Sequence, residues 1–228
     1  MARSITAQRL SWRIMDDACR RQRLLAPGKL VPRRSHGEKK VEMSSSQSAP
    51  ILTADKAGAG RLMLRPRRAA DAEALFPTMA DPSIMRWWSR PAFDHIDQLR
   101  ENFASDGQSA WRSWAIIPAG SDQAIGFVSA GWKREGVMEI GYLLARHAQG
   151  RGYARNAVSM LIDHLFEEGN RRVFADTDPE NHASIALLTA LGFSREGHLR
   201  AEWHTHIGIR DSLIFGLLAE EWSLRNAR

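Results

Sequence analysis

The sequence predicts an α+β fold in which helices flank one central sheet. The main observation behind this prediction is a unit of strand, loop, helix and strand at residues 137–176. Its first strand, residues 137–144, is almost wholly apolar in its second half, as expected for a strand covered on both faces. Its helix carries a 3.6-residue apolar stripe and ends at Gly169 and Asn170, before a strand at residues 172–176. A right-handed parallel crossover is the default for such a unit.

Apolar periodicity and turn residues predict the other elements. Asp94 is a suitable N-cap for the helix that follows it. No repeat period is visible, which argues against a solenoid. The remaining elements are a strand at 61–65, a helix at 71–79, a loop containing Trp87 and Trp88, a helix at 94–103, strands at 114–117 and 125–132, a helix at 183–191, and strands near 193–203 and 209–217.

The loop inside the unit at residues 137–176 is suited to binding an anion. Gly150, Gly152 and Ala154 leave little side chain over the first helical turn, so unpaired N–H groups can reach a pyrophosphate at the positive end of the helix dipole. Arg151 can add a charged fork to the same oxygens. The alternative is that the two glycines only form a tight connection. A nicotinamide-binding fold is disfavoured because the third glycine of its fingerprint is missing.

Several short motifs together resemble the GNAT superfamily of acetyl-coenzyme A dependent N-acetyltransferases. They are Gln149-x-x-Gly152-x-Ala154, Asn181-x-x-Ser184 and Gly192-Phe193. Further motifs are similar to the RimJ/RimL branch, which contains ribosomal-protein N-terminal acetyltransferases: residues 61–66, 81–88, 139–142 and 210–218, with Glu221-Trp222. The resemblance spans about residues 60–222. It covers nothing before them.

The resemblance implies a mixed, mostly antiparallel sheet whose parallel strand pair splays apart to admit the pantetheine arm of acetyl-coenzyme A (acetyl-CoA). It also implies that Asn181 binds the pantetheine and that Ser184 lies near the thiolate. N-capping of the following helix is the alternative role for both. The expected acetyl-CoA contacts are Gly141, Tyr142, Leu143, Leu144, Gln149, Gly150, Arg151, Gly152, Tyr153, Ala154, Asn181 and Ser184.

Direct attack of an amine on the thioester needs a neutral amine and a stabilised leaving thiolate. Many members of the family place a tyrosine acid where this chain has Leu188, which leaves Ser184 or a water for that task. Tyr142 is a further candidate, or a core anchor. Glu139 is the first choice of general base, because partial burial raises the pKa of a carboxylate; a solvent-facing strand position is the alternative. Glu202 and Asp211 are runners-up, and Asp211 can instead pair with Arg210 or Arg200.

The acceptor is either a protein N-terminal α-amine or a small-molecule amine such as an aminoglycoside, a polyamine or an amino-acid analogue. An α-amine has a pKa of about 7.7 to 8.0, against about 10.4 for lysine, so it suits a site with little acid–base machinery. Trp87 and Trp88 are expected to wall the acceptor site. Trp111 is a further aromatic candidate, and core packing is the alternative for this cluster, with Trp114 and Trp132 expected to be buried.

No metal is expected, because His198, His204 and His206 lack a completing ligand pattern. Two function classes remain: the acetyltransferase, and a non-catalytic acyl-coenzyme A sensor whose basic arm contacts nucleic acid. Nucleic-acid binding is not expected, because the basic clusters of the arm lack interleaved aromatic residues. A homodimer is left open.

We predict two regions, a basic, disordered arm with its linker at residues 1–59 and a catalytic domain at 60–228. The formal net charge of +6 comes from the arm: residues 1–42 hold eleven Lys or Arg against four Asp or Glu. Met43 precedes a serine-rich linker and could itself be the start codon. The single cysteine, Cys19, forms no intramolecular disulfide, and no apolar run is long enough to span a membrane. A cytoplasmic protein is expected.

Overall fold

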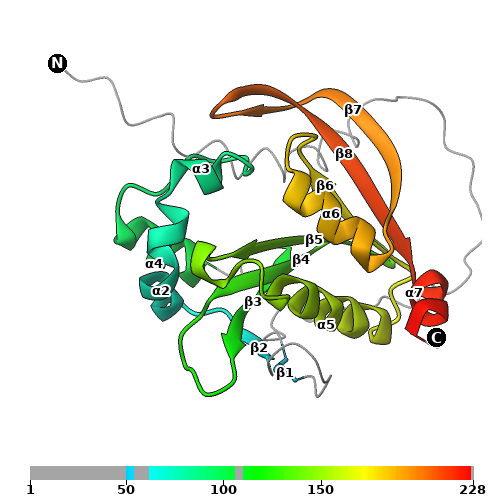
Figure 1. Cartoon of the computed structure of the whole chain (residues 1–228), viewed down its shortest axis with the longest axis horizontal. Coiled ribbons are helices and arrows are strands. Elements are labelled where there is room, and N and C mark those ends of the chain that lie inside the picture. Colours follow the sequence, from blue (N-terminus) through cyan, green and yellow to red (C-terminus); the bar gives the residue numbers. More distant parts are fainter. Residues whose placement is uncertain (1–49, 54–61, 106–109, 227–228) are drawn as a thin grey trace, which may run out of the picture. The chain divides into compact units, whose positions relative to one another are not determined.

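The computed structural model describes residues 50–53, 62–105 and 110–226, all within one compact unit, Ser46–Arg228. In this part of the chain the strands form an eight-stranded sheet in the order β1-β2-β3-β4-β5-β6-β8-β7 (Figure 1). All neighbouring strands are antiparallel except β5 and β6. The strands are β1 (Leu52–Thr53), β2 (Leu62–Pro66), β3 (Trp111–Pro118), β4 (Gly126–Arg134), β5 (Val137–Leu144), β6 (Arg172–Thr177), β7 (Ser194–Thr205) and β8 (Gly208–Leu218).

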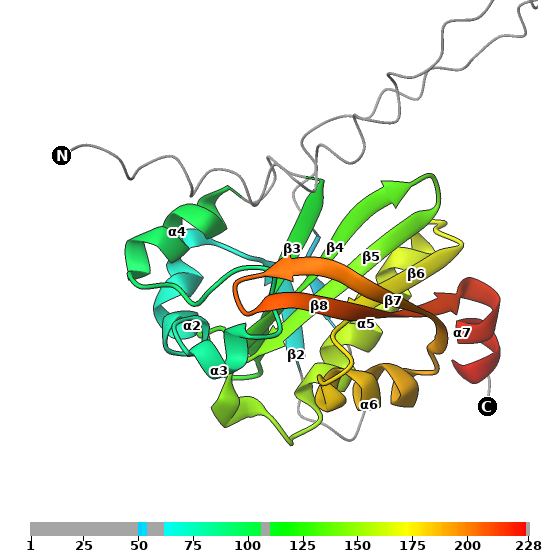
Figure 2. The same cartoon turned by 90° about the horizontal axis from the view of Figure 1, so that it is seen from above.

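Helices cover both faces of the sheet, as the two views show (Figures 1 and 2). On one face, α2, α3 and α4 pack on a cluster that includes Phe127 and Leu143. On the other, α5 and α6 pack on a cluster that includes Val128 and Ile140. Neighbouring strand residues thus enter different cores, because side chains alternate along a strand. The helices are η2 (Ala69–Asp71), α2 (Ala72–Met79), α3 (Pro82–Met85), α4 (Ile96–Ala104), η3 (Arg146–Ala148), α5 (Tyr153–Glu167), α6 (His182–Leu191) and α7 (Ala219–Asn226).

The parallel strands β5 and β6 separate after a short paired stretch. They pair from Val137 with Arg172 to Glu139 with Phe174. Beyond Glu139, β5 still pairs with β4 and β6 still pairs with β8, so the separation is confined to this one junction. We call the opening between the diverging strands the split. The predicted fold class, a mostly antiparallel sheet with a splayed parallel pair and flanking helices, is confirmed.

Three local predictions are wrong or incomplete. Asp94 does not cap α4, which begins at Ile96 behind His95 without a side-chain cap. Helix α3 was missed although its signals are local: Asp81 accepts the N–H of Ser83 at 2.8 Å, and proline stands at the first helical position. Helix α7 was missed as well.

The two strand tryptophans differ from each other. Trp114 is fully buried, as predicted, and its indole Nε1 donates to the Pro50 carbonyl at 2.8 Å. Trp132 is 45% exposed, so the prediction that it is buried is wrong. The pairing register of β4 with β5 shifts between Trp132 and Arg134. At such an irregularity the side chains no longer alternate regularly between the two faces of the sheet.

Part of the predicted linker belongs to the sheet. Leu52 and Thr53 form the edge strand β1, which pairs with Leu64 and Met63 of β2. The domain boundary at residue 60 stays a prediction, as does the role of the basic arm with Cys19 and Met43, which lies outside the described residues. Within residues 50–53, 62–105 and 110–226, no helix is long and apolar enough to cross a membrane.

Candidate active site

The loop between β5 and α5 presents an uncapped helix start. Gly150 and Gly152 have φ values of 74° and 77°, a left-handed region that favours glycine. Gly152 is the N-cap residue of α5 and provides no side-chain hydrogen bond. The first-turn N–H groups of this 15-residue helix are therefore available to an anion, with the helix dipole behind them.

Gln149 shapes this loop from within. Its side-chain Nε2 donates to the Leu144 carbonyl at 3.0 Å, and its backbone N–H donates to the Arg146 carbonyl at 3.2 Å. Gln149 thus ties the end of β5 to the start of the loop. The structure gives it a positioning contact that the motif alone does not reveal.

Asn181 and Ser184 lie at the start of α6, beside the split. Asn181 is the N-cap residue, and its Oδ1 accepts the N–H of Ser184 at 3.2 Å. The capping role, one of the two interpretations of Asn181, is therefore present. Capping uses only the amide oxygen, so it is compatible with donation from the amide nitrogen to a ligand.

Tyr142 of β5 reaches the same helix. Its hydroxyl lies 2.6 Å from the Ser184 Oγ. Burial raises the pKa of Tyr142 to about 12, although the hydrogen bond with Ser184 acts in the opposite direction. Leu188, one helical turn further along α6, is fully buried in the core. The phenol nearest to Ser184 in the described chain thus comes from the strand and not from the helix.

Glu139 stands where β5 and β6 part. Its side chain is 15% exposed, and its Oε2 lies 2.5 Å from Lys133 Nζ. Burial raises the pKa of Glu139, Lys133 lowers it, and the nearby Asp176 carboxylate raises it again. A carboxylate with a raised pKa in a sheltered position is suited to accept a proton near neutral pH.

Asp176 of β6 is a carboxylate beside Glu139 that sequence analysis did not single out. Its carboxylate accepts the indole N–H of Trp203 at 2.9 Å and the hydroxyl of Ser212. Among the described residues no Lys or Arg forms an ion pair with it. Asp176 lies two residues after Phe174, so the two side chains are on the same face of β6. Phe174 pairs with Glu139, and this strand pairing brings the two carboxylates to one face of the sheet. The spacing is visible in the sequence, but the pairing is not.

The predicted acceptor wall is divided between two roles. Trp88 packs 5.7 Å from Phe127, between ring centroids, and so belongs partly to the core. Trp87 carries the Arg86 guanidinium 4.5 Å above its ring. The Trp111 ring packs closely over Gly131. The same ring would lie 4.0 Å from a Cβ atom added at Gly141. Gly141 is otherwise open, which leaves room beside β5 for a ligand.

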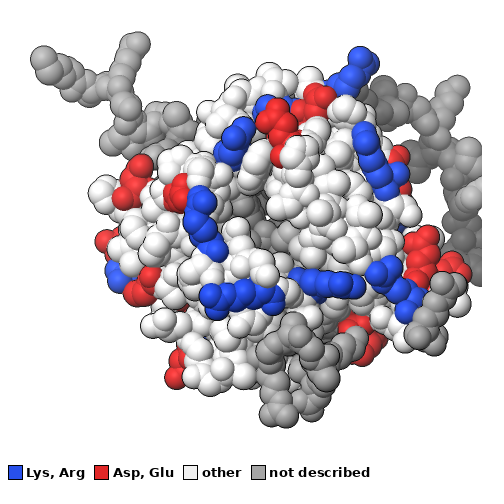
Figure 3. Space-filling model, in the orientation of Figure 1, with Lys and Arg blue, Asp and Glu red and all other residues white. Residues whose placement is uncertain are grey.

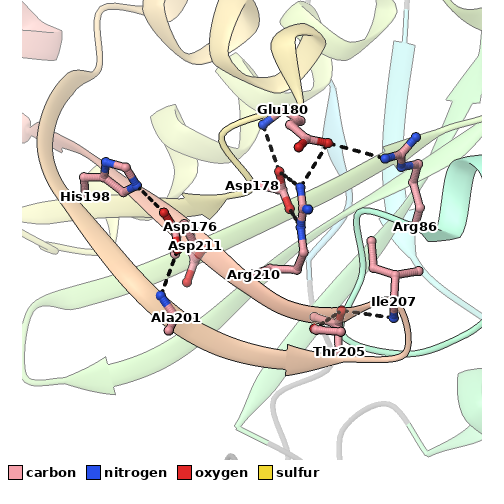
Figure 4. A network of polar contacts seen from close by, with 12 residues as sticks. Arg86, Asp176, Asp178, Glu180, His198, Ala201, Thr205, Ile207, Arg210 and Asp211 are labelled. Carbon is pink, nitrogen blue, oxygen red and sulfur yellow. Dashed lines mark hydrogen bonds and ion pairs between the residues drawn. The ribbon is translucent and has the colours of Figure 1, made fainter.

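Charged side chains hold the loop between β6 and α6 (Figure 4). The Arg210 guanidinium binds both carboxylate oxygens of Asp178, at 2.7 and 2.9 Å, and lies 3.0 Å from Glu180. Glu180 also lies 3.4 Å from Arg86, which follows α3. This network fixes the loop that presents Asn181, and it connects that loop to the segment bearing Trp87.

The runner-up bases lie elsewhere. Glu202 is exposed on β7. Asp211 accepts the N–H of Ala201 and pairs with His198, both at 2.8 Å, instead of the expected Arg210 or Arg200 (Figure 4). These two contacts lower the pKa of Asp211, which makes it a poor base. No group of three or more potential metal ligands occurs among the described residues.

The surface is consistent with an anionic ligand. Figure 3 shows a hollow in one face of the molecule, with basic side chains (blue) on several sides of it. The uncapped helix start, the unpaired strand edges and the open space beside Gly141 fit a long ligand with phosphates at one end. This fold with this arrangement has the features that an acyltransferase needs to hold a coenzyme A thioester.

The comparisons with known proteins name the family. The acetyltransferase (GNAT) domain family matches residues 61–194, and the chain belongs to it. It is 33% identical over 172 residues to p20 of Bacillus licheniformis, named an uncharacterized N-acetyltransferase, a match that covers 72% of this chain and 96% of p20. The protein is therefore an acetyl-CoA dependent N-acetyltransferase. The alternative of a non-catalytic sensor is set aside.

Solved structures agree with this assignment. A probable GNAT-family acetyltransferase from Chromobacterium violaceum has a TM-score of 0.69 at 28% identity, covering 85% of this chain and 100% of that one. RimJ of Mycobacterium smegmatis, in complex with CoA-disulfide, has a TM-score of 0.64 at 26% identity, covering 76% and 87%. The expected similarity to the GNAT superfamily is confirmed.

Proposed function

We propose that acetyl-CoA binds in the split with its pyrophosphate at the start of α5. The observation that carries this proposal is the end of β5–β6 pairing at Glu139 and Phe174, which frees two strand edges for an extended arm. The pantetheine contacts would be Gly141, Tyr142, Leu143, Leu144 and Asn181. The phosphate contacts would be Gln149, Gly150, Arg151, Gly152, Tyr153 and Ala154, and the thioester would lie near Ser184.

Glu139 is the proposed general base. The neutral amine attacks the thioester carbon, the new N–C bond forms and the C–S bond breaks. Glu139 takes the amine proton, directly or through a water, and the sulfur leaves with the electron pair of the broken bond. Both substrates are bound together, and no covalent acyl-enzyme is needed.

For the acceptor we propose a protein N-terminal α-amine, and we infer a place in the RimJ/RimL-like branch. The 26% identity to RimJ of Mycobacterium smegmatis supports this. The low pKa of an α-amine supports it as well, because one raised-pKa carboxylate suffices to deprotonate such a group. Trp87 and Trp88 remain the proposed wall of this end of the site.

One observation favours a second candidate, a polycationic small-molecule amine. Glu139 and Asp176 place two carboxylates near the split, and in the described chain only Lys133 is paired with them. The remaining negative charge would attract a cation. The spermidine N(1)-acetyltransferase of Vibrio cholerae is 23% identical over 153 residues, a match that covers 63% of this chain and 84% of that one.

The test is release of free thiol from acetyl-CoA across a panel of acceptors. The panel holds peptides with free N-termini, the same peptides with blocked N-termini and an internal lysine, spermidine, and an aminoglycoside. Turnover confined to the free N-terminal peptides supports the first candidate, and turnover of spermidine alone supports the second. No turnover of any amine would contradict both.

The coenzyme site has its own test. Gly152→Asp adds bulk and negative charge beside the proposed phosphates, and we expect a loss of acetyl-CoA affinity of at least 10-fold, since a charge placed there opposes the helix dipole as well as the ligand. Calorimetry measures it. Unchanged affinity in a folded variant would contradict the assignment of the loop.

A further inference from the structure

A tyrosine and a serine connect the two sides of the split. Tyr142 lies on β5, past the last residue that pairs with β6, and Ser184 lies on the first turn of α6. Their hydroxyl oxygens are 2.6 Å apart, a short and well-formed hydrogen bond. The two residues are 42 positions apart in the chain, so this hydrogen bond forms only when folding brings β5 and α6 together.

The direction of this hydrogen bond follows from acidity. A phenol is a stronger acid than an aliphatic alcohol, so the better donor is Tyr142 and the better acceptor is Ser184. The pKa of Tyr142, raised to about 12 by burial, keeps the phenol protonated near neutral pH. With Tyr142 as donor, the hydroxyl proton of Ser184 is released for a different acceptor.

The backbone of Ser184 is fixed as well. Its N–H donates to Asn181 Oδ1 at 3.2 Å in the helix cap. The cap and the Tyr142 hydroxyl together set where Ser184 Oγ lies. Tyr142 itself packs against the core cluster that contains Ile140 and Leu188, so its ring has little freedom to leave.

We propose that Tyr142 is a positioning residue for the leaving group, which orients and polarises Ser184 so that the serine hydroxyl donates a hydrogen bond to the departing sulfur. The inference rests on the proposed location of the thioester near Ser184. It assigns to a strand tyrosine a task that the buried Leu188 cannot perform, and it adds a residue to the reaction that Glu139 begins.

The proton balance is simple. As the amine attacks, the electron pair of the C–S bond goes to sulfur, and Glu139 holds the proton lost by the amine. A thiol has a reference pKa of about 8.5, far below that of Tyr142, so the phenol proton is not transferred at equilibrium. Ser184 stabilises the forming thiolate by hydrogen-bond donation, Tyr142 supports it by donating to Ser184 Oγ, and the thiolate acquires its proton from solvent after release.

The first experiment is a double-mutant cycle with Tyr142→Phe and Ser184→Ala. We expect Tyr142→Phe to lower kcat about 10-fold, the worth of one hydrogen bond of about 1.4 kcal/mol. Acetyl-CoA affinity by calorimetry should change little, because the proposed pantetheine contact of Tyr142 is made by the backbone of β5, which the substitution keeps. The double variant should be no worse than Ser184→Ala alone, because Tyr142 acts through Ser184. The matched control is Thr189→Val, which removes another hydroxyl of α6, one bonded to the Ile185 carbonyl, and should retain wild-type kcat.

The second measurement separates this role from a structural one. The donor is replaced by the selenoester analogue of acetyl-CoA, whose selenolate is a better leaving group and needs less stabilisation. With this donor, the ratio of the wild-type kcat to the Tyr142→Phe kcat should fall toward one. Equal losses with both donors, an unchanged kcat with acetyl-CoA, or additive effects in the cycle would each overturn the proposal. Failure of the wild-type protein to release thiol with any amine would instead overturn the proposed function.

Discussion

At the scale of single residues, charge balance around Glu139 sets the pH range of the proposed chemistry. Burial and the Asp176 carboxylate raise the pKa of Glu139, and Lys133 opposes them from 2.5 Å. A general base works only when it is deprotonated. The acid limb of the pH–rate profile should therefore report the pKa that these neighbours produce.

Lys133→Met should shift that acid limb to higher pH. Loss of the ammonium group removes the main influence that lowers the pKa of Glu139, while burial still raises it. The measurement is the pH dependence of kcat/KM. Lys133→Arg keeps the charge and should leave the acid limb nearly in place. An acid limb that does not move in Lys133→Met would show that Glu139 is not the titrating base.

Glu139→Gln should abolish the acid limb and lower kcat by about 10² to 10⁴-fold.

Asn181 allows capping and ligand binding to be separated. Asn181→Asp keeps an oxygen acceptor for the Ser184 N–H but loses the amide donor, whereas Asn181→Ala loses both. We expect Asn181→Asp to keep its melting temperature within a few degrees and bind acetyl-CoA more weakly. Asn181→Ala should also lose about 1 kcal/mol of the free energy of unfolding. Calorimetry and thermal unfolding measure the two effects, and wild-type acetyl-CoA affinity in Asn181→Asp would assign this residue to capping alone.

At the scale of elements, the loop between β6 and α6 depends on Arg210 of β8. Burial alone would raise the pKa of Asp178, but the Arg210 fork and the Glu180 N–H outweigh it, and the pKa of Asp178 is lowered. A carboxylate with a lowered pKa in the folded state contributes stability above its unfolded pKa of about 3.9, and this stability is lost as the pH falls through the folded pKa.

Arg210→Met should therefore lower the melting temperature at pH 7 by several degrees, and the difference from wild type should begin to shrink below about pH 4 and vanish only below the lowered pKa of Asp178. It should also raise the KM for acetyl-CoA, because the loop that presents Asn181 loses its attachment to the sheet. Arg86→Met is the control, since Arg86 lies 3.4 Å from the exposed Glu180 and makes a weaker pair. A deficit that persists unchanged in acid would contradict the ion-pair explanation.

At the scale of the whole molecule, the sequence divides into a basic segment and a nearly neutral remainder. The described unit includes β1, which follows the basic segment in the chain and covers the edge of β2. The Pro50 carbonyl is the acceptor for the buried indole of Trp114. The part of the chain that the fold needs thus begins before the residues matched by the family.

Two truncations test this. A chain beginning at Met43 should keep the melting temperature and acetyl-CoA affinity of the full protein, because residues 1–42 carry no apolar period strong enough for a core. A chain beginning at Arg61 loses β1 and leaves the Trp114 donor unpaired, which should cost about 1 to 3 kcal/mol. Thermal unfolding of both separates the cases. A large loss on removal of residues 1–42 would show that the arm packs on the domain.

Local sequence patterns determined the central unit of this protein. The strand at 137–144, the loop with Gly150 and Gly152, and the helix that follows depend on residues a few positions apart, so their periodicity and turn chemistry are visible in the chain itself. Glu139 was proposed as the base for the same reason, as a carboxylate in an apolar strand. The family motifs, being short and local, pointed to acetyl-CoA.

Tertiary structure decided which groups meet. The split exists because β6 leaves β5 after Glu139 and Phe174 while both strands keep their other partners. Trp203 reaches Asp176 across 27 residues, and Tyr142 reaches Ser184 across 42. Neither pair has a local signature, since the spacing of strands within a sheet is set by packing and pairing of the whole chain. The residues of the site could be proposed one by one from sequence, but their contacts, and hence their charges and proton positions, required the fold.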